Sequence, residues 1–250
     1  MHFAAQLNYD ELIMSAGYYG KLPMRGDFIQ RNMSPDFVNT WDNWLQSVIA
    51  TSRHNLGHDW LDSYLVAPIW RYLIPQHSKS YQLGVMLPSV DKVGRYFPFT
   101  IGINIIPLSD AAHIITSNKE WFDMAETIAL QALDESIDYE QLNDIVDELE
   151  VKNFAPLYSS NQRVSFRIPV DKLSSLNSAL DESIQHIESE PKFNFSYWWN
   201  EGNEEVQGNL ICCEGMPDDN IYTAMLDGKW ELCHVETKDS THLYTGMAYQ

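Results

Sequence analysis

The chain has 250 residues, of which 44% are hydrophobic and 20% charged, so it can bury a core without disulfide or metal support. Its 35 Asp and Glu residues outnumber its 16 Lys and Arg residues, which gives a formal net charge of -19. A surface of that sign repels phosphate backbones and anionic lipid headgroups, so neither nucleic acid nor a membrane is an expected partner. The charge serves either solubility or attraction of a basic protein, and composition leaves both open.

The cysteine pattern and the absence of export signals indicate a cytoplasmic protein. Cys212, Cys213 and Cys233 form no CxxC motif and no Cys/His pair at zinc spacing, which is typical of reduced thiols. The first residues lack the basic region and continuous apolar core of a signal peptide. No segment approaches the ~20 apolar residues that span a bilayer. We expect a cytoplasmic location, no direct membrane insertion, no metal and no cofactor.

The first elements follow from local signals. We expect residues 1–16 to be an N-terminal tail and the stretch from Gly17 to be a short strand entering a turn. Ser34-Pro35-Asp36 has the N-cap, the first-turn proline and the first-turn acid of a helix start. Apolar residues at spacings of three and four continue that helix, and Gly57 ends it. A second short helix is predicted over 58–66.

Three apolar runs follow within about forty residues and predict a sheet with short connections. We expect these strands over 69–74, 82–89 and 96–106, with a kink at Pro98 in the last.

A helical region is predicted over 118–151. From Glu120 to Glu150 there are eleven acidic residues and no Lys or Arg. This is either a solvated helical face or a docking surface for a basic partner. The candidate docking face comprises Asp134, Glu135, Asp138, Glu140, Asp144, Asp147 and Glu148.

The last part of the chain predicts a strand over 163–168, a helix over 171–186, an aromatic strand over 193–199, a helix over 221–226 and a strand over 229–235. No linker or repeat interrupts the pattern. We therefore expect an α/β fold: one layered domain over residues 17–250, with a mixed sheet and helices on both faces.

No catalytic motif emerges from the sequence. The Gly17–Lys21 stretch has the wrong spacing for a P-loop, and Ser89 lacks the glycines of a nucleophile elbow. Asp27 and Asp91 leave two interpretations open. They form ion pairs with Arg25, Arg71 or Arg95 that fix loop geometry, or they are the carboxylates of an unrecognised hydrolase.

Six segments in order resemble the TagF family of type VI secretion-associated proteins. They are the Gly17-Tyr18-Tyr19-Gly20-Lys21-Leu22-Pro23 entry, Arg25-Gly26-Asp27-Phe28, Trp41-Asp42-Asn43-Trp44-Leu45, Leu56-Gly57 with Trp60-Leu61, Ala67-Pro68-Ile69-Trp70-Arg71, and Pro88 to Pro98. Residues 17–108 are the best-matching part, followed by an acidic helical region over 109–170 and a C-terminal part over 171–250. Ser109 to Asp171 matches nothing in the family, so that region is expected to be peculiar to this chain.

The resemblance implies a cytoplasmic accessory protein that represses type VI secretion after translation through protein–protein binding. It implies no catalytic residues, and it names type VI components as partners, above all the forkhead-associated-domain scaffold protein. Lys21, Arg25, Asp27, Asp91, Lys92 and Arg95 form either a protein-contact surface or a structural ion-pair network. Gly20, Gly26, Gly94, Trp41, Trp44, Trp60 and Trp70 are expected to be fold anchors, as turn glycines and large core side chains.

Overall fold

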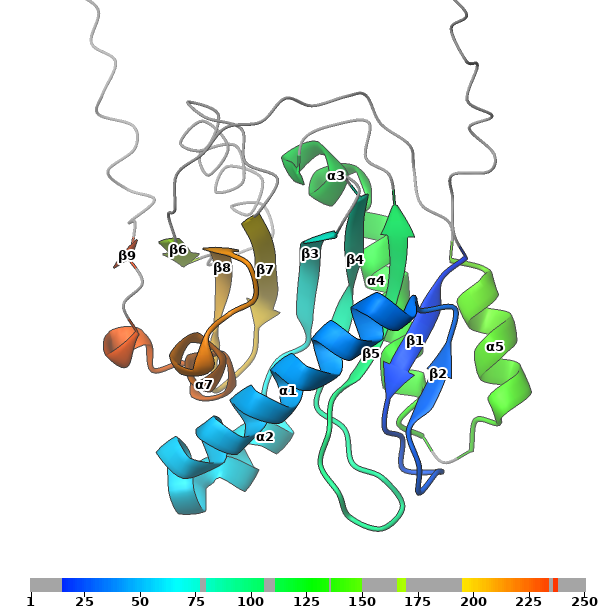
Figure 1. The fold of residues 1–250 in the computed structure, drawn as a ribbon, viewed down its shortest axis with the longest axis horizontal. Helices are drawn as coiled ribbons and strands as arrows, with labels where there is room; N and C mark the ends of the chain where they lie inside the picture. Colours follow the sequence, from blue (N-terminus) through cyan, green and yellow to red (C-terminus); the bar gives the residue numbers. More distant parts are fainter. Residues whose placement is uncertain are drawn as a thin grey trace, which may run out of the picture.

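The computed structural model describes residues 15–76, 80–105, 111–134, 136–149, 166–169, 195–233 and 236–237, and it confirms the α/β class (Figure 1). The helices of this part, with 3-10 turns written η, are α1 (Pro35–Leu56), η2 (Gly57–Asp59), α2 (Trp60–Val66), α3 (Ala111–Ser117), α4 (Lys119–Gln131), α5 (Tyr139–Asp147), α7 (Asp219–Asp227) and η4 (Trp230–Leu232). The strands are β1 (Gly17–Gly20), β2 (Ile29–Arg31), β3 (Trp70–Gln76), β4 (Ser80–Leu87), β5 (Phe99–Ile105), β6 (Phe166–Pro169), β7 (Phe195–Gly202), β8 (Gln207–Glu214) and β9 (Glu236–Thr237).

The described strands form one sheet in the order β2-β1-β5-β4-β3-β7-β8-β6-β9. Neighbouring strands are antiparallel except β6 and β9, so the sheet is mixed through that one parallel pair. β3, β4 and β5 are antiparallel because each pairs with its neighbour in sequence through a connection too short for a crossover.

One apolar cluster lies between the sheet and α1, α2 and α7. On β3, alternate residues Trp70, Tyr72 and Ile74 point into it, as the pleat of a strand requires. Trp41 of α1 packs at 4.9 Å from Tyr72 and 5.9 Å from Trp198, measured between ring centroids. These aromatic contacts bury large area and fix α1 across the middle strands (Figure 1).

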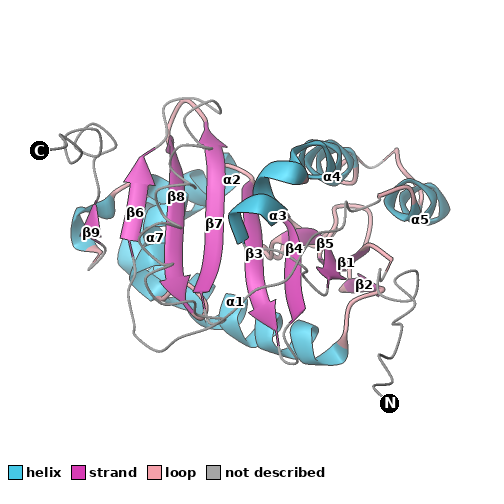
Figure 2. Cartoon of the chain, turned by 90° about the horizontal axis from the view of Figure 1, so that it is seen from above, coloured by secondary structure: helices cyan, strands magenta, loops and turns pink. Residues whose placement is uncertain are grey.

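A second apolar cluster uses the alternate side chains of the same strands, such as Leu73 of β3. Trp121 and Phe122 of α4 pack into it, and Phe122 lies 4.8 Å from Trp199 of β7. Seen from above in Figure 2, α4 and α5 lie on the opposite side of the strands from α1 and α7.

The capping signals of the first helix act as expected. The Ser34 side chain accepts a hydrogen bond from the Phe37 backbone N–H, and the backbone leaves the helix at Gly57. The helical region predicted over 118–151 contains two helices with a break between them. α4 ends at Gln131, and α5 begins at Tyr139 because Asp138 forms a capping box with Gln141.

The last strands were partly missed. β8 was not predicted, although it lies between β7 and β6; its Gly208 and Asn209 are residues that strands disfavour. The strand predicted over 229–235 is instead the 3-10 turn η4, followed by the two-residue strand β9. The helix predicted over 171–186 and most of the predicted N-terminal tail lie outside the described residues.

Candidate functional site

Two loops from distant parts of the sequence meet at one end of the sheet. Residues 21–28 connect β1 to β2, and residues 90–96 belong to the β4–β5 connection; both lie at the bottom of Figure 1. The Lys92 backbone N–H donates to the Arg25 carbonyl oxygen at 2.9 Å, and the Arg95 guanidinium donates to the Gly26 carbonyl oxygen. We call residues 21–28 and 90–96 the tip.

The centre of the tip is a carboxylate with four donors. Asp91 accepts hydrogen bonds from Lys21 Nζ at 2.5 Å and Arg95 Nε at 2.6 Å, and from the backbone N–H groups of Val93 and Arg95. Burial alone would raise the pKa of Asp91, but these donors together hold it well below its usual range. Asp91 is therefore ionised at neutral pH, and its carboxylate joins the two loops.

This arrangement gives Asp91 a structural role. A base needs a pKa near the working pH, and a carboxylate with a strongly lowered pKa is a weak one. Asp27 is exposed, and in the described part of the chain neither carboxylate forms a hydrogen bond or ion pair with a histidine. The geometry gives no support to a hydrolase built on Asp27 and Asp91.

Arg71, one of the expected partners of these carboxylates, binds elsewhere. Its buried guanidinium contacts Asp123 at 2.9 Å, Glu126 at 2.6 Å and Glu201 at 3.3 Å, so it links β3 to α4 and to the end of β7. Burial lowers the pKa of Arg71, but the hydrogen bond and the charge of Glu126, with Asp123 and Glu201, raise it overall. Acids of the predicted helical region thus hold α4 on the sheet.

The six charged residues predicted for the tip fall into two groups. Lys21 and Asp91 are buried and cannot touch a partner, whereas Arg25, Asp27, Lys92 and Arg95 are exposed. Within the described residues Arg25 and Lys92 form no ion pair; the Arg25 guanidinium instead lies 5.8 Å from the ring centroid of Tyr139 on α5. Two cationic groups of the tip therefore have no neutralising carboxylate among the described residues.

Two apolar side chains at the tip were not identified from the sequence. Phe28 is 44% exposed and Val93 is 68% exposed. The inner side of Phe28 is fixed, because its ring centroid lies 5.5 Å from Tyr19 and 4.8 Å from Phe97, and Lys21 Nζ lies 4.5 Å from it. Phe28 belongs to the Arg25–Phe28 motif, but the sequence around it has no periodicity that would predict whether its side chain is exposed.

The residues of the predicted acidic face also fall into two groups, those with structural contacts and those that are exposed. Asp138 caps α5, Asp134 accepts from the Ser136 backbone N–H at 2.8 Å, and Asp147 pairs with Arg31 at 2.6 Å. Glu140, Asp144 and Glu148 are exposed along one side of α5, and no ion pair involves them in the described part of the chain. Glu135 lies outside the described residues.

The expected fold anchors are placed as follows. Trp41, Trp44, Trp60 and Trp70 all lie in the core. Gly20 has a φ of 139°, and a Cβ there would lie 2.3 Å from the Pro98 carbonyl oxygen. Gly94 has a φ of 85° in open space. Gly26 is a correction: its φ is not in the left-handed region and nothing lies near its missing Cβ, so the backbone does not require glycine there.

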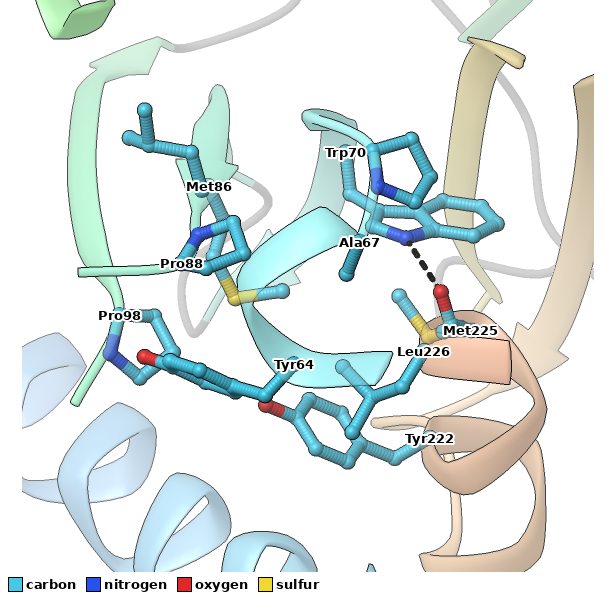
Figure 3. Close-up of a pocket in the computed structure, with 11 residues that line it drawn as sticks. Tyr64, Ala67, Trp70, Met86, Pro88, Pro98, Tyr222, Met225 and Leu226 are labelled. Atoms are coloured by element: carbon cyan, nitrogen blue, oxygen red, sulfur yellow. Dashed lines mark hydrogen bonds between the residues drawn. The ribbon is translucent and has the colours of Figure 1, made fainter. Parts of the chain in front are cut away.

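An apolar pocket lies between α2, the end of β4 and α7 (Figure 3). Its walls include Pro88, Pro98 and the ring of Tyr222, whose buried hydroxyl forms no hydrogen bond with another described residue. Among the described residues that line it there is no carboxylate or histidine, and the pocket has room for about one water molecule.

The sequence match covers more of the chain than the quoted motifs. Residues 17–149 match the family model described as the TagF N-terminal domain, type VI secretion system-associated. The chain belongs to the TagF family. Because the match continues to Leu149, the acidic helices up to that residue are part of the TagF domain, and our expectation that they are peculiar to this chain is wrong.

A solved structure is similar to most of the chain. The chain is similar to the Pseudomonas aeruginosa PAO1 protein PA0076, known from a crystal structure, with 28% sequence identity and a TM-score of 0.69. The similarity covers 86% of this TagF chain and 95% of that protein. No curated protein matches the chain. Among the described residues, no helix is long and apolar enough to cross a membrane, and no three metal-binding side chains converge.

Proposed function

We propose that this TagF protein represses type VI secretion by binding another component of the machine, without catalysing a reaction. The observation that carries the proposal is the family match over residues 17–149. The geometry of the tip is consistent with it, because Asp91 is held by four donors while Arg25 and Lys92 are exposed and form no ion pair with another described residue. The proposed partner is the forkhead-associated-domain scaffold protein, and the proposed location is the cytoplasm.

Deletion and direct binding test this function together. Removal of the protein from a bacterium that produces it should raise secretion of type VI effectors, and return of the wild-type protein should lower it again. The purified chain should bind the purified scaffold protein. Unchanged secretion after deletion, together with no binding to the scaffold, would refute the proposal.

Asp27→Asn separates binding from hydrolysis. Asp27 is exposed and forms no hydrogen bond or ion pair with another described residue, so its amide should leave the fold intact. A binding protein carrying this change still represses secretion. A hydrolase that uses Asp27 loses repression, because an amide cannot act as base or nucleophile.

A further inference from the structure

The tip reverses the charge of the rest of the molecule. Residues 21–28 and 90–96 contain four of the 16 Lys and Arg residues but only two of the 35 Asp and Glu residues. One of those two acids, Asp91, is buried and already neutralised by Lys21 and Arg95. The exposed surface here is therefore cationic on a chain whose net charge is -19.

The cationic groups lie on the same two loops as exposed apolar side chains. Arg25 and Lys92 belong to the same two loops as Phe28 and Val93, and the hydrogen bond between the Lys92 N–H and the Arg25 carbonyl places the two backbones in contact. Arg and exposed aromatic residues are enriched in protein interfaces, where an apolar centre is ringed by polar groups. The tip has both parts of that composition.

The tip is also held in one shape. Asp91 joins both loops through Lys21 and Arg95, and Phe28 is packed against Tyr19 and Phe97. A surface that is already ordered loses little conformational entropy when it binds. This favours recognition of a defined segment of a protein over insertion into a lipid layer, which the acidic remainder of the chain would also oppose.

We propose that the tip binds an acidic segment of a partner protein that carries an exposed apolar side chain. Carboxylates of that segment pair with Arg25 and Lys92, and its apolar side chain packs on Phe28 and Val93. The inference rests on the proposed function, since it names the chemistry that the bound component would have.

Synthetic peptides test this chemistry directly. The probes are a labelled Glu/Asp-rich peptide with one central Phe, the same peptide with Ala in place of Phe, and a Lys-rich peptide with the Phe kept. The acidic Phe peptide should bind most tightly, and its affinity should fall as salt rises because the exposed charge pairs are screened. Equal binding of the three peptides, or preference for the Lys-rich one, overturns the proposal.

Charge reversal locates the site. The double variant Arg25→Glu with Lys92→Glu should bind the acidic Phe peptide about tenfold or more weakly. The matched control is Lys119→Glu with Lys229→Glu, which changes net charge equally at side chains that are 47% and 68% exposed elsewhere. A loss that is equal in both variants shows that the site is not at the tip.

The apolar part has its own variants. Val93→Ala should weaken the acidic Phe peptide severalfold without weakening the acidic Ala peptide, because Val93 is 68% exposed and its truncation leaves the fold intact. Phe28→Ala should weaken it further. If the affinity for the acidic Phe peptide is unchanged in both variants, the proposed apolar contact is refuted.

Two further outcomes keep this inference separate from the proposed function. If Arg25→Glu with Lys92→Glu still binds the scaffold protein normally and represses secretion, the tip proposal fails while the proposed function stands. If the wild-type chain binds phosphatidylglycerol vesicles and the double variant does not, the tip contacts lipid, and the protein-segment proposal also fails.

Discussion

Lys21 Nζ lies 2.5 Å from Asp91 Oδ2, although the two residues are 70 positions apart in the chain. Both side chains are removed from solvent, and the Arg95 guanidinium shares the same oxygen at 2.6 Å. The Ser89 hydroxyl adds a 2.7 Å hydrogen bond to the Lys21 carbonyl oxygen. The shape of the tip therefore depends on a charged contact between two loops.

Loss of the Asp91 charge should destabilise the fold. Asp91→Asn keeps an oxygen for the Val93 and Arg95 backbone donors but leaves the Lys21 ammonium without its buried counter-charge. We expect the free energy of unfolding to fall by about 2–3 kcal/mol, below the usual cost in a deep core because the loops lie near the surface. Urea unfolding of the purified variant measures it.

Lys21→Met combined with Asp91→Asn is the control. It removes the unpaired charge, so the double variant should lose less stability than the sum of the two single variants. Additive losses would show that the two groups do not stabilise each other.

Acid should weaken the same contact. The pKa of Asp91 is lowered in the folded chain, so its contribution to stability is complete above the unfolded pKa of about 3.9 and is lost as the pH falls towards the folded value. The difference in unfolding free energy between the wild type and Asp91→Asn should be constant from about pH 7 to 5 and shrink below about pH 4. A difference that grows in acid contradicts this sign.

Local signals in the sequence located the helices better than the sheet partners. The ends of α1 could be predicted from Ser34-Pro35 and Gly57, because a helix cap and a helix terminator each act within one turn. The sequence of β8 gave no comparable signal, because Gly208 and Asn209 have low strand propensity. The strand forms there because it pairs with β7. Propensity is a weak guide where tertiary pairing decides the structure.

The tip was foreseen as a set of charged residues but not as a geometry. The sequence left open which of Arg25, Arg71 and Arg95 pairs with Asp91. That choice depends on β1 lying beside β5, with Tyr18 opposite Ile101, which brings the two loops to the same end of the sheet. A register between strands this far apart in sequence has no local signature.

Arg71 is expected to stabilise the packing of α4 against the sheet. Arg71→Met leaves Asp123, Glu126 and Glu201 close together, and among the described residues Lys119 is then the one cation paired with Asp123. We expect a loss of about 3 kcal/mol and faster hydrogen exchange in α4. Arg71→Lys should recover only part of the loss, because an ammonium cannot span three carboxylates in the geometry of a guanidinium. Normal exchange rates in Arg71→Met would rule out this role.

Gly20 and Gly26 provide a matched pair for the backbone at the tip. At Gly20 an added Cβ meets the Pro98 carbonyl oxygen at 2.3 Å and the φ of 139° is strained for any other residue, so Gly20→Ala should cost about 2–4 kcal/mol. At Gly26 an added Cβ meets nothing, and Gly26→Ala should change stability by no more than about 0.5 kcal/mol. Urea unfolding of both variants compares them. Similar losses in the two variants would contradict the described geometry, which places a steric conflict at Gly20 and none at Gly26.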